Sequence, residues 1–183
     1  MMRKMMMTMA AVLCCAMIST VFTSCSKDDD DKNPVDNNNP VAAVMDVSLT
    51  VGDDMVGKLN LSVEYYDADG KVQTEPLTTN EWKKSIKAKL PATLGVRLMV
   101  KAKDGIDYAS LQKLTESYLY AYDVYPVNAI GNNLGGGKDG ISHLSLDIPG
   151  SKVAEWIADE SKGVVKILYT VDANGQVTSS TWK

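Results

Sequence analysis

The residues best suited to catalysis lie in one short stretch, as His143, Ser145 and Asp147. His143 is the only histidine of the chain, and alternate residues of a strand point to the same face of a sheet. A nucleophilic site requires a base that is bonded to the nucleophile and oriented by a third group. Asp147 lies beyond Ser145, on the wrong side to orient the imidazole of His143. We therefore interpret the three residues as the solvent face of a strand, and predict no catalytic residues and no enzymatic activity.

Metal and phosphate sites have no better candidates. The chain has no cysteine after Cys25, so only carboxylates remain in the region that follows, and these suit calcium. Segments 52–54 and 67–70 carry aspartates but lack the pattern of a calcium loop, so both are predicted turns. Stretch 131–140 is rich in glycine, but it lacks the first glycine of a phosphate loop and the Ser or Thr after its lysine. It is predicted to be a long connection, and no metal or other cofactor is predicted.

Tyr118, Tyr120 and Tyr122 form the most suggestive pattern, because their spacing places them on one face of a strand, with Tyr125 close by. A tyrosine ring suits stacking on a sugar or contact with a protein. The four tyrosines are therefore the candidate ligand-binding residues. The favoured interpretation, however, is that the row covers a core, since same-face aromatic residues of strands commonly pack there.

Strands must position these residues, because the apolar pattern after residue 44 mostly has a period of two. Apolar and polar residues alternate in segments 45–51, 59–65, 86–90, 96–102, 118–124, 141–148 and 165–171. Similar sequences around Asp67 and Asp172 predict two hairpins with the same turn chemistry rather than a repeat. Helical signals are limited to a turn within 109–114 and a short helix near 151–160, which Ser151 can cap.

Length, composition and strand number together indicate the fold class. The hydrophobic fraction of 45% and the charged fraction of 23% are ordinary for a globular protein. Eight or so short strands with turn signals between them are typical of an antiparallel sandwich. We predict a mainly β fold, an immunoglobulin-like antiparallel β-sandwich with one short helix. A small antiparallel β-barrel is the alternative.

The first 24 residues follow the order of segments that is typical of a signal peptide, and they lack the alternating pattern of the predicted strands. Arg3 and Lys4 precede an apolar stretch, and small residues follow it. A permanent transmembrane helix is the alternative, but polar residues interrupt the stretch and acidic residues follow it. Removal of this segment leaves 17 Lys and Arg against 23 Asp and Glu, a net charge of −6. The remaining basic residues are scattered among acids, which argues against nucleic-acid binding.

The junction Phe22-Thr23-Ser24-Cys25 resembles a bacterial lipobox, in which the peptide is cut before the cysteine and the cysteine carries the lipid. The residues that follow resemble the acidic export signal of surface lipoproteins of the Bacteroidota: Ser26, Lys27, Asp28, Asp29, Asp30 and Asp31. The resemblance implies lipidation of Cys25 and an outer-membrane lipoprotein exposed at the cell surface, with a periplasm-facing lipoprotein as the alternative. Apart from the resemblance, the acidic run is explained by a solvated tether.

The predicted chain therefore has three parts: a signal peptide (1–24), a lipidated cysteine with an acidic run and a polar tether (25–40), and a single β-rich domain (41–183). The expected partners are the membrane, through the lipid on Cys25, and a glycan or protein ligand, with the oligomeric state left open. We expect a non-catalytic binding or adhesion domain. A structural or accessory subunit of an envelope complex is the main alternative, and a lipid carrier or small hydrolase is less favoured.

Overall fold

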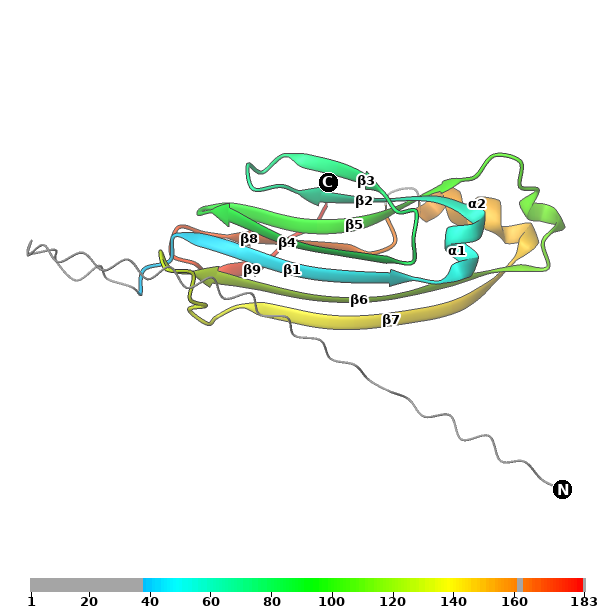
Figure 1. Cartoon of the computed structure of the whole chain (residues 1–183). Helices are drawn as coiled ribbons and strands as arrows, with labels where there is room; N and C mark the ends of the chain where they lie inside the picture. Colours follow the sequence, from blue (N-terminus) through cyan, green and yellow to red (C-terminus); the bar gives the residue numbers. More distant parts are fainter. Residues whose placement is uncertain (1–37, 161–162, 183) are drawn as a thin grey trace, which may run out of the picture. The chain divides into compact units, whose positions relative to one another are not determined.

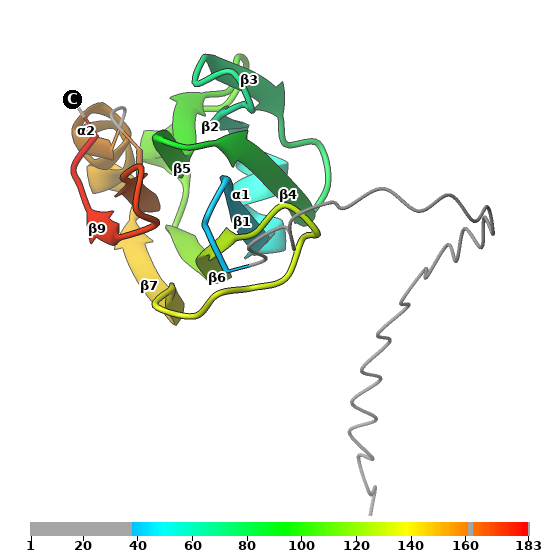
Figure 2. The ribbon, with the colours of Figure 1, turned by 90° about the vertical axis from the view of Figure 1, so that its left-hand side faces the viewer.

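The computed structural model describes residues 38–160 and 163–182, all within one compact unit. Nine strands in these residues form two antiparallel sheets that pack face to face (Figures 1 and 2). The four-stranded sheet has the order β4 (Glu81–Lys89), β1 (Ala42–Val51), β6 (Lys113–Val127) and β7 (Lys138–Pro149). The five-stranded sheet has the order β3 (Val72–Pro76), β2 (Leu59–Tyr66), β5 (Ala92–Ala102), β8 (Lys166–Val171) and β9 (Val177–Ser179). The prediction of a β-sandwich is confirmed, and the described strands do not form a closed barrel.

Alternation along the strands builds one main core between the sheets. β1 turns Met45, Leu49 and Val51 inward, and each is at most 1% exposed. β5 turns Leu94 and Leu98 toward them from the other sheet, and both are 0% exposed. Truncation of one fully buried leucine to alanine typically costs about 2–5 kcal/mol. A shift of either strand by one residue would expose this whole set, so the core determines the strand register.

Two hairpins close with the same turn, as the sequence indicates. The carboxylates of Asp67 and Asp172 each accept hydrogen bonds from the backbone N–H groups two and four residues farther along, at 2.8–2.9 Å. Gly70 and Gly175 supply the positive φ that the turns need, 74° and 81°. The predicted equivalence of the two turns is therefore confirmed.

The segment after β1 is a short helix, α1 (Asp53–Lys58), and not the predicted turn. Asp54 accepts the backbone N–H of Thr115 at 2.6 Å and pairs with Lys58. The side chain of Asn80 donates to Asp53 at 2.7 Å. Six residues are too few for a helical period to be evident, and these contacts with distant segments stabilise the helix.

The predicted helix near 151–160 exists as α2 (Gly150–Glu160), but the predicted cap at Ser151 is wrong. The N–H of Gly150 donates to the carbonyl oxygen of Gln112 at 3.3 Å, so β7 continues directly into the helix. Ser151 therefore lies in the first turn. A Cβ at Gly150 would come within 1.8 Å of the Leu111 carbonyl oxygen, so this corner requires glycine.

The predicted helical turn within 109–114 is only partly correct. The 3-10 helix η1 covers Tyr108–Ser110, and Lys113 and Leu114 already belong to β6. The hydroxyl of Tyr108 donates to the carbonyl oxygen of Lys58 at 2.7 Å and joins η1 to the end of α1. In the described part of the chain, no helix is long and apolar enough to cross a membrane.

A polar network joins the two sheets where β3 and β4 approach each other. Glu75 on β3 accepts hydrogen bonds from the hydroxyl of Tyr65 at 2.7 Å and from the indole of Trp82 at 2.8 Å. Glu75 also pairs with the ammonium group of Lys84. Trp82 and Lys84 belong to the four-stranded sheet and the other two residues to the five-stranded sheet. These bonds, with that from Lys84 the strongest, lower the pKa of Glu75 to about 2.

We expect Glu75→Gln to lower the free energy of unfolding at neutral pH by about 1 kcal/mol, a modest loss because the group is partly exposed and water screens it. The pKa of folded Glu75 lies below its ordinary value, so the carboxylate stabilises the fold above about pH 4.5 and this contribution is lost toward about pH 2. Urea unfolding of both proteins should show the difference shrinking over that interval. A difference equally large in acid and at neutral pH would contradict the assignment.

Candidate functional site

The predicted tyrosine row lies between the sheets. Tyr118, Tyr120 and Tyr122 are half-buried and pack against the core. Neighbouring rings stack with their centroids 6.3 and 6.4 Å apart. The hydroxyl groups of Tyr122 and Tyr169, on β8, are hydrogen-bonded at 2.7 Å. Burial, and then this bond, raises the pKa of Tyr122 to about 12. The row therefore connects the two sheets, in line with the favoured interpretation that it covers the core.

Tyr125 lies on the opposite face of β6, because an odd step along a strand reverses the direction of the side chain. Its ring packs with Val44 and Val127 on the outer surface of the four-stranded sheet. Its hydroxyl donates to Asp46 at 2.8 Å, and burial together with this bond raises the pKa of Tyr125 to about 12. The four candidate tyrosines therefore do not form one surface.

His143, Ser145 and Asp147 lie exposed on the outer face of β7, where the sequence places them. The carboxylate of Asp147 accepts hydrogen bonds from the ammonium group of Lys113 at 2.6 Å and from the hydroxyl of Thr115 at 2.8 Å. Both donors are on β6, so Asp147 supports the pairing of β6 with β7 and does not orient the imidazole of His143.

The glycine-rich stretch 131–140 is a connection as far as Lys138, where β7 begins. The N–H of Asn132 donates to the side chain of Asn128 at 2.8 Å, and the N–H of Leu134 donates to the carbonyl oxygen of Pro126 at 3.0 Å. These N–H groups are used to hold the loop against β6, so they are not presented to a phosphate group.

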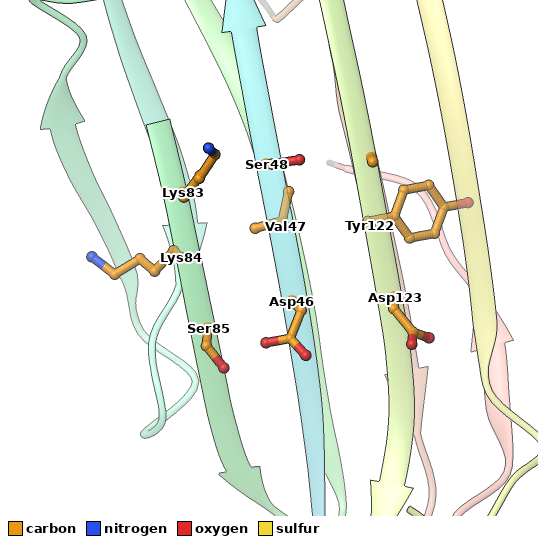
Figure 3. Close-up of a pocket in the computed structure, with 9 residues that line it drawn as sticks. Asp46, Val47, Ser48, Lys83, Lys84, Ser85, Tyr122 and Asp123 are labelled. Atoms are coloured by element: carbon orange, nitrogen blue, oxygen red, sulfur yellow. The ribbon is translucent and has the colours of Figure 1, made fainter. Parts of the chain in front are cut away.

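A hollow on the outer surface crosses β4, β1 and β6 (Figure 3). It is open to solvent and has a volume of about 570 Å³. Ser48 and Ala121 are cross-strand neighbours with small side chains, and they leave the depression between taller neighbours. The taller neighbours carry charged or hydroxyl groups: Lys83, Ser85, Asp46 and Asp123.

Carboxylates dominate one side of this hollow. The register places Asp46 opposite Asp123, and Asp123 opposite Asp139 of β7, so three adjacent strands contribute a row of aspartates. Partial desolvation, followed by the charges of Asp139 and Asp46, raises the pKa of Asp123. Like charges that face each other across strands destabilise a sheet. A cationic group that occupies the hollow would relieve this repulsion.

The hollow is suited to reversible binding. Its lining includes no histidine or cysteine, and no group of three or more His, Cys, Asp or Glu within the described residues could hold a metal ion. Its lining includes two carboxylates, two lysines, of which Lys84 is paired with Glu75, and the hydroxyl groups of two serines and Tyr122. Sequence analysis missed this site because an outward-facing aspartate on a strand is unremarkable until strand pairing brings three together.

A second aromatic group lies on the outer face of the five-stranded sheet. The ring of Trp182 contacts that of Tyr66, with centroids 5.1 Å apart, and the guanidinium of Arg97 lies 4.6 Å from the Trp182 ring centroid. A Cβ at Gly95 would come within 3.2 Å of the Trp182 ring. The side chain of Leu168, which a Cβ at Gly95 would approach to 2.5 Å, and the indole together cover the space that Gly95 leaves in the centre of the sheet. We interpret this group as packing rather than as a ligand platform.

Comparison with known proteins places the chain in no family, because no family model, no curated protein and no solved structure matches it. Cys25 and the acidic run 26–31, on which the lipoprotein prediction depends, lie outside the described residues. A functional assignment must therefore come from the chemistry of this chain's own residues.

We expect Tyr120→Ala to lower the free energy of unfolding by about 2–3 kcal/mol, because the half-buried ring packs against the core. The control Tyr120→Phe keeps the ring and should stay within about 0.5 kcal/mol of the unmodified protein. Urea unfolding measures both. If Tyr120→Ala unfolds at the same urea concentration as the unmodified protein, the ring does not contribute to the core.

Proposed function

We propose that this protein is a lipoprotein, anchored in the outer membrane through Cys25 and exposed at the cell surface, whose β-sandwich is a non-catalytic binding module. The observation that carries the proposal is the order of segments that begins the chain. A lipobox-like junction ends at Cys25, an acidic run follows, and a polar stretch with two prolines leads to the domain. Two or three acyl chains provide stable anchoring, whereas one would be marginal.

The character of the domain supports binding rather than catalysis. His143, Ser145 and Asp147 do not act together, because the carboxylate of Asp147 accepts hydrogen bonds from Lys113 and Thr115 instead. The hollow on the outer face of β4, β1 and β6 is accessible and has a cluster of polar groups. Such a surface suits a ligand that binds and dissociates.

The charges at the hollow favour a protein ligand with amino or guanidinium groups over a neutral glycan. Asp46, Asp123 and Asp139 form a row on the outer face. Of the two lysines in the lining of the hollow, Lys83 and Lys84, the second is paired with Glu75. The rings of Tyr118, Tyr120 and Tyr122, which would suit a sugar, are packed between the sheets. Exposed ion pairs contribute only about 0.2–1 kcal/mol each, so useful affinity requires several contacts across the hollow.

The cellular location is tested by protease treatment of intact cells that produce the full chain. We expect protease to remove the domain of the unmodified protein, because it faces outward. Replacement of Asp28, Asp29, Asp30 and Asp31 by alanine should protect the domain, since the export signal is lost. The variant Cys25→Ala should fail to incorporate a radiolabelled fatty acid.

The outcomes of this experiment separate the two orientations. Protection of the unmodified domain until the outer membrane is broken would show that it faces the periplasm. Fatty-acid incorporation that persists in Cys25→Ala would contradict the anchor itself.

The binding site is tested with arrays of basic peptides and of neutral glycans. We expect basic peptides to bind, and the double variant Asp46→Asn, Asp123→Asn to bind them at least tenfold more weakly, a loss of about 1.4 kcal/mol. Binding should also weaken in acid, because the pKa of Asp123 is raised and this carboxylate is neutralised at a higher pH than an ordinary aspartate.

The matched control is Asp104→Asn, which removes one exposed carboxylate from a loop of the five-stranded sheet. It should bind basic peptides like the unmodified protein. Equal losses in both variants would indicate non-specific attraction to a protein of net negative charge. Binding of glycans alone, unaffected by the double variant, would place the site elsewhere.

A further inference from the structure

Strand β7 leaves one side of the four-stranded sheet open. It pairs with β6 over its whole length, from Lys138 to Pro149, and no strand in the described part of the chain pairs with its other side (Figure 2). A bare edge exposes backbone N–H and C=O groups that can pair with another chain. Twelve residues make β7 long for an edge strand.

The two edges of this sheet are protected to different degrees. β4, at the opposite edge, carries exposed lysines at Lys83, Lys87 and Lys89, and charged side chains of this kind hinder pairing. β7 instead presents Ile141, which is 74% exposed, and Leu146, which is 53% exposed. The apolar surface at the edges of this sheet is thus concentrated on β7, whose charged residues Lys138, Asp139 and Asp147 lie toward the ends of the strand.

One hydrogen bond shows which residues of β7 face this edge. The N–H of Gly150 donates toward β6, to Gln112, in the same register as the ladder. Hydrogen-bonded pairs alternate along an antiparallel ladder. Even-numbered residues of β7 therefore bond to β6. Odd-numbered residues, from Asp139 to Asp147, direct their N–H and C=O groups outward. Pro149, which has no N–H, also occupies an outward position.

We propose that two copies of this protein pair through the free edges of β7, antiparallel, about a two-fold axis at Ser142. Ile141 then faces His143 of the second copy, and Asp139 faces Ser145 of the second copy. Each of these pairs occurs twice by symmetry and exchanges two backbone hydrogen bonds, because all four residues direct these groups outward. This proposal does not rest on the proposed function.

Charge and geometry select this register over its neighbours. Paired side chains of the two copies lie on the same face of the sheet only if the axis passes through a residue. Alternative registers therefore move the axis by whole residues. An axis nearer the start of β7 would pair fewer residues. An axis at His143 would place Asp139 opposite Asp147 in both halves, which is unfavourable for like charges. An axis at Leu144 would place Asp139 opposite Pro149, which cannot donate, and would bring the loop end of one strand against the start of α2 in the other copy.

The pairing would create a continuous eight-stranded sheet from two four-stranded ones. Because the axis is perpendicular to the sheet, the outer faces of both copies point the same way. The hollows centred on β1 would lie five strand spacings apart, about 24 Å. A dimer would therefore present two hollows side by side, an arrangement that strengthens attachment to a repeating ligand.

The test uses cysteine crosslinking of the full chain in membranes of cells that produce it. Ser142→Cys introduces the first thiol after Cys25, and the proposed axis brings the two Cα atoms to about 4.5 Å, within disulfide range. Mild oxidation should convert most of this variant to a covalent dimer. The matched control is Ser145→Cys, which is equally exposed at the surface but whose two copies would be about 20 Å apart. It should form no covalent dimer, and neither should the unmodified chain, although both still pair through β7.

A second pair of variants tests the edge itself in the Ser142→Cys background. Ile141→Lys adds a charge to the pairing edge and should reduce the crosslinked fraction at least tenfold. Val72→Lys makes the same change at an edge residue of the five-stranded sheet that is 47% exposed, and should leave crosslinking unchanged. Absence of the Ser142→Cys dimer, equal crosslinking of Ser145→Cys, or equal loss in both lysine variants would each overturn the proposal.

Discussion

The two-residue period of the strands is the constraint on which the rest of this structure depends. Each strand must bury one set of alternate side chains between the sheets, so every other residue is committed to the outer surface. On β1 the inner set is nearly pure hydrophobic, with Met45 and Leu49 almost fully buried. The same parity sends Asp46 and Ser48 outward and provides the surface hollow. Core and candidate site are thus two consequences of one alternation.

Apolar packing alone does not hold the two sheets together at the margins of the sandwich, because water reaches the inner faces there. At the β3–β4 margin the network around Glu75 supplies paired polar groups from both sheets. Deeper along the inner faces, the stacked rings of β6 serve the same purpose, with the hydroxyl of Tyr122 bonded to that of Tyr169. Within the described residues, no buried side-chain nitrogen or oxygen lacks a hydrogen-bond partner. Polar and aromatic groups therefore join the sheets, and hydrogen bonds offset the cost of removing the polar groups from water.

The outer features of the domain differ in how they balance stability against interaction. The aspartate row at the hollow sets like charges on neighbouring strands and raises the pKa of Asp123. The free edge of β7 exposes Ile141, whereas β4 carries lysines at the other edge of the sheet. Repulsion and exposed apolar surface both have a cost in the isolated domain. Both costs would fall if another molecule occupied the surface, and the proposals of ligand binding and strand pairing are based on this.

The sequence by itself determined the local features. The strands follow from alternation, the two equivalent turns follow from Asp67 and Asp172 with their glycines, and the sandwich class follows from the number and spacing of strands. It also carries the lipobox-like junction, which needs no fold to be identified. These signals are local because each depends on side chains within a few residues of one another.

Only the tertiary structure decided which strands became neighbours and which face of each strand became the inside. Alternation shows that Tyr118, Tyr120 and Tyr122 share a face, but an aromatic ring suits a core or a surface, so burial against the second sheet was needed to choose. The short helix α1 depends on contacts with Asn80 and Thr115, which are distant in sequence. The hollow and the free edge of β7 arise from the order β4-β1-β6-β7. Strand order is the result of non-local packing, and no pattern within a single segment encodes it.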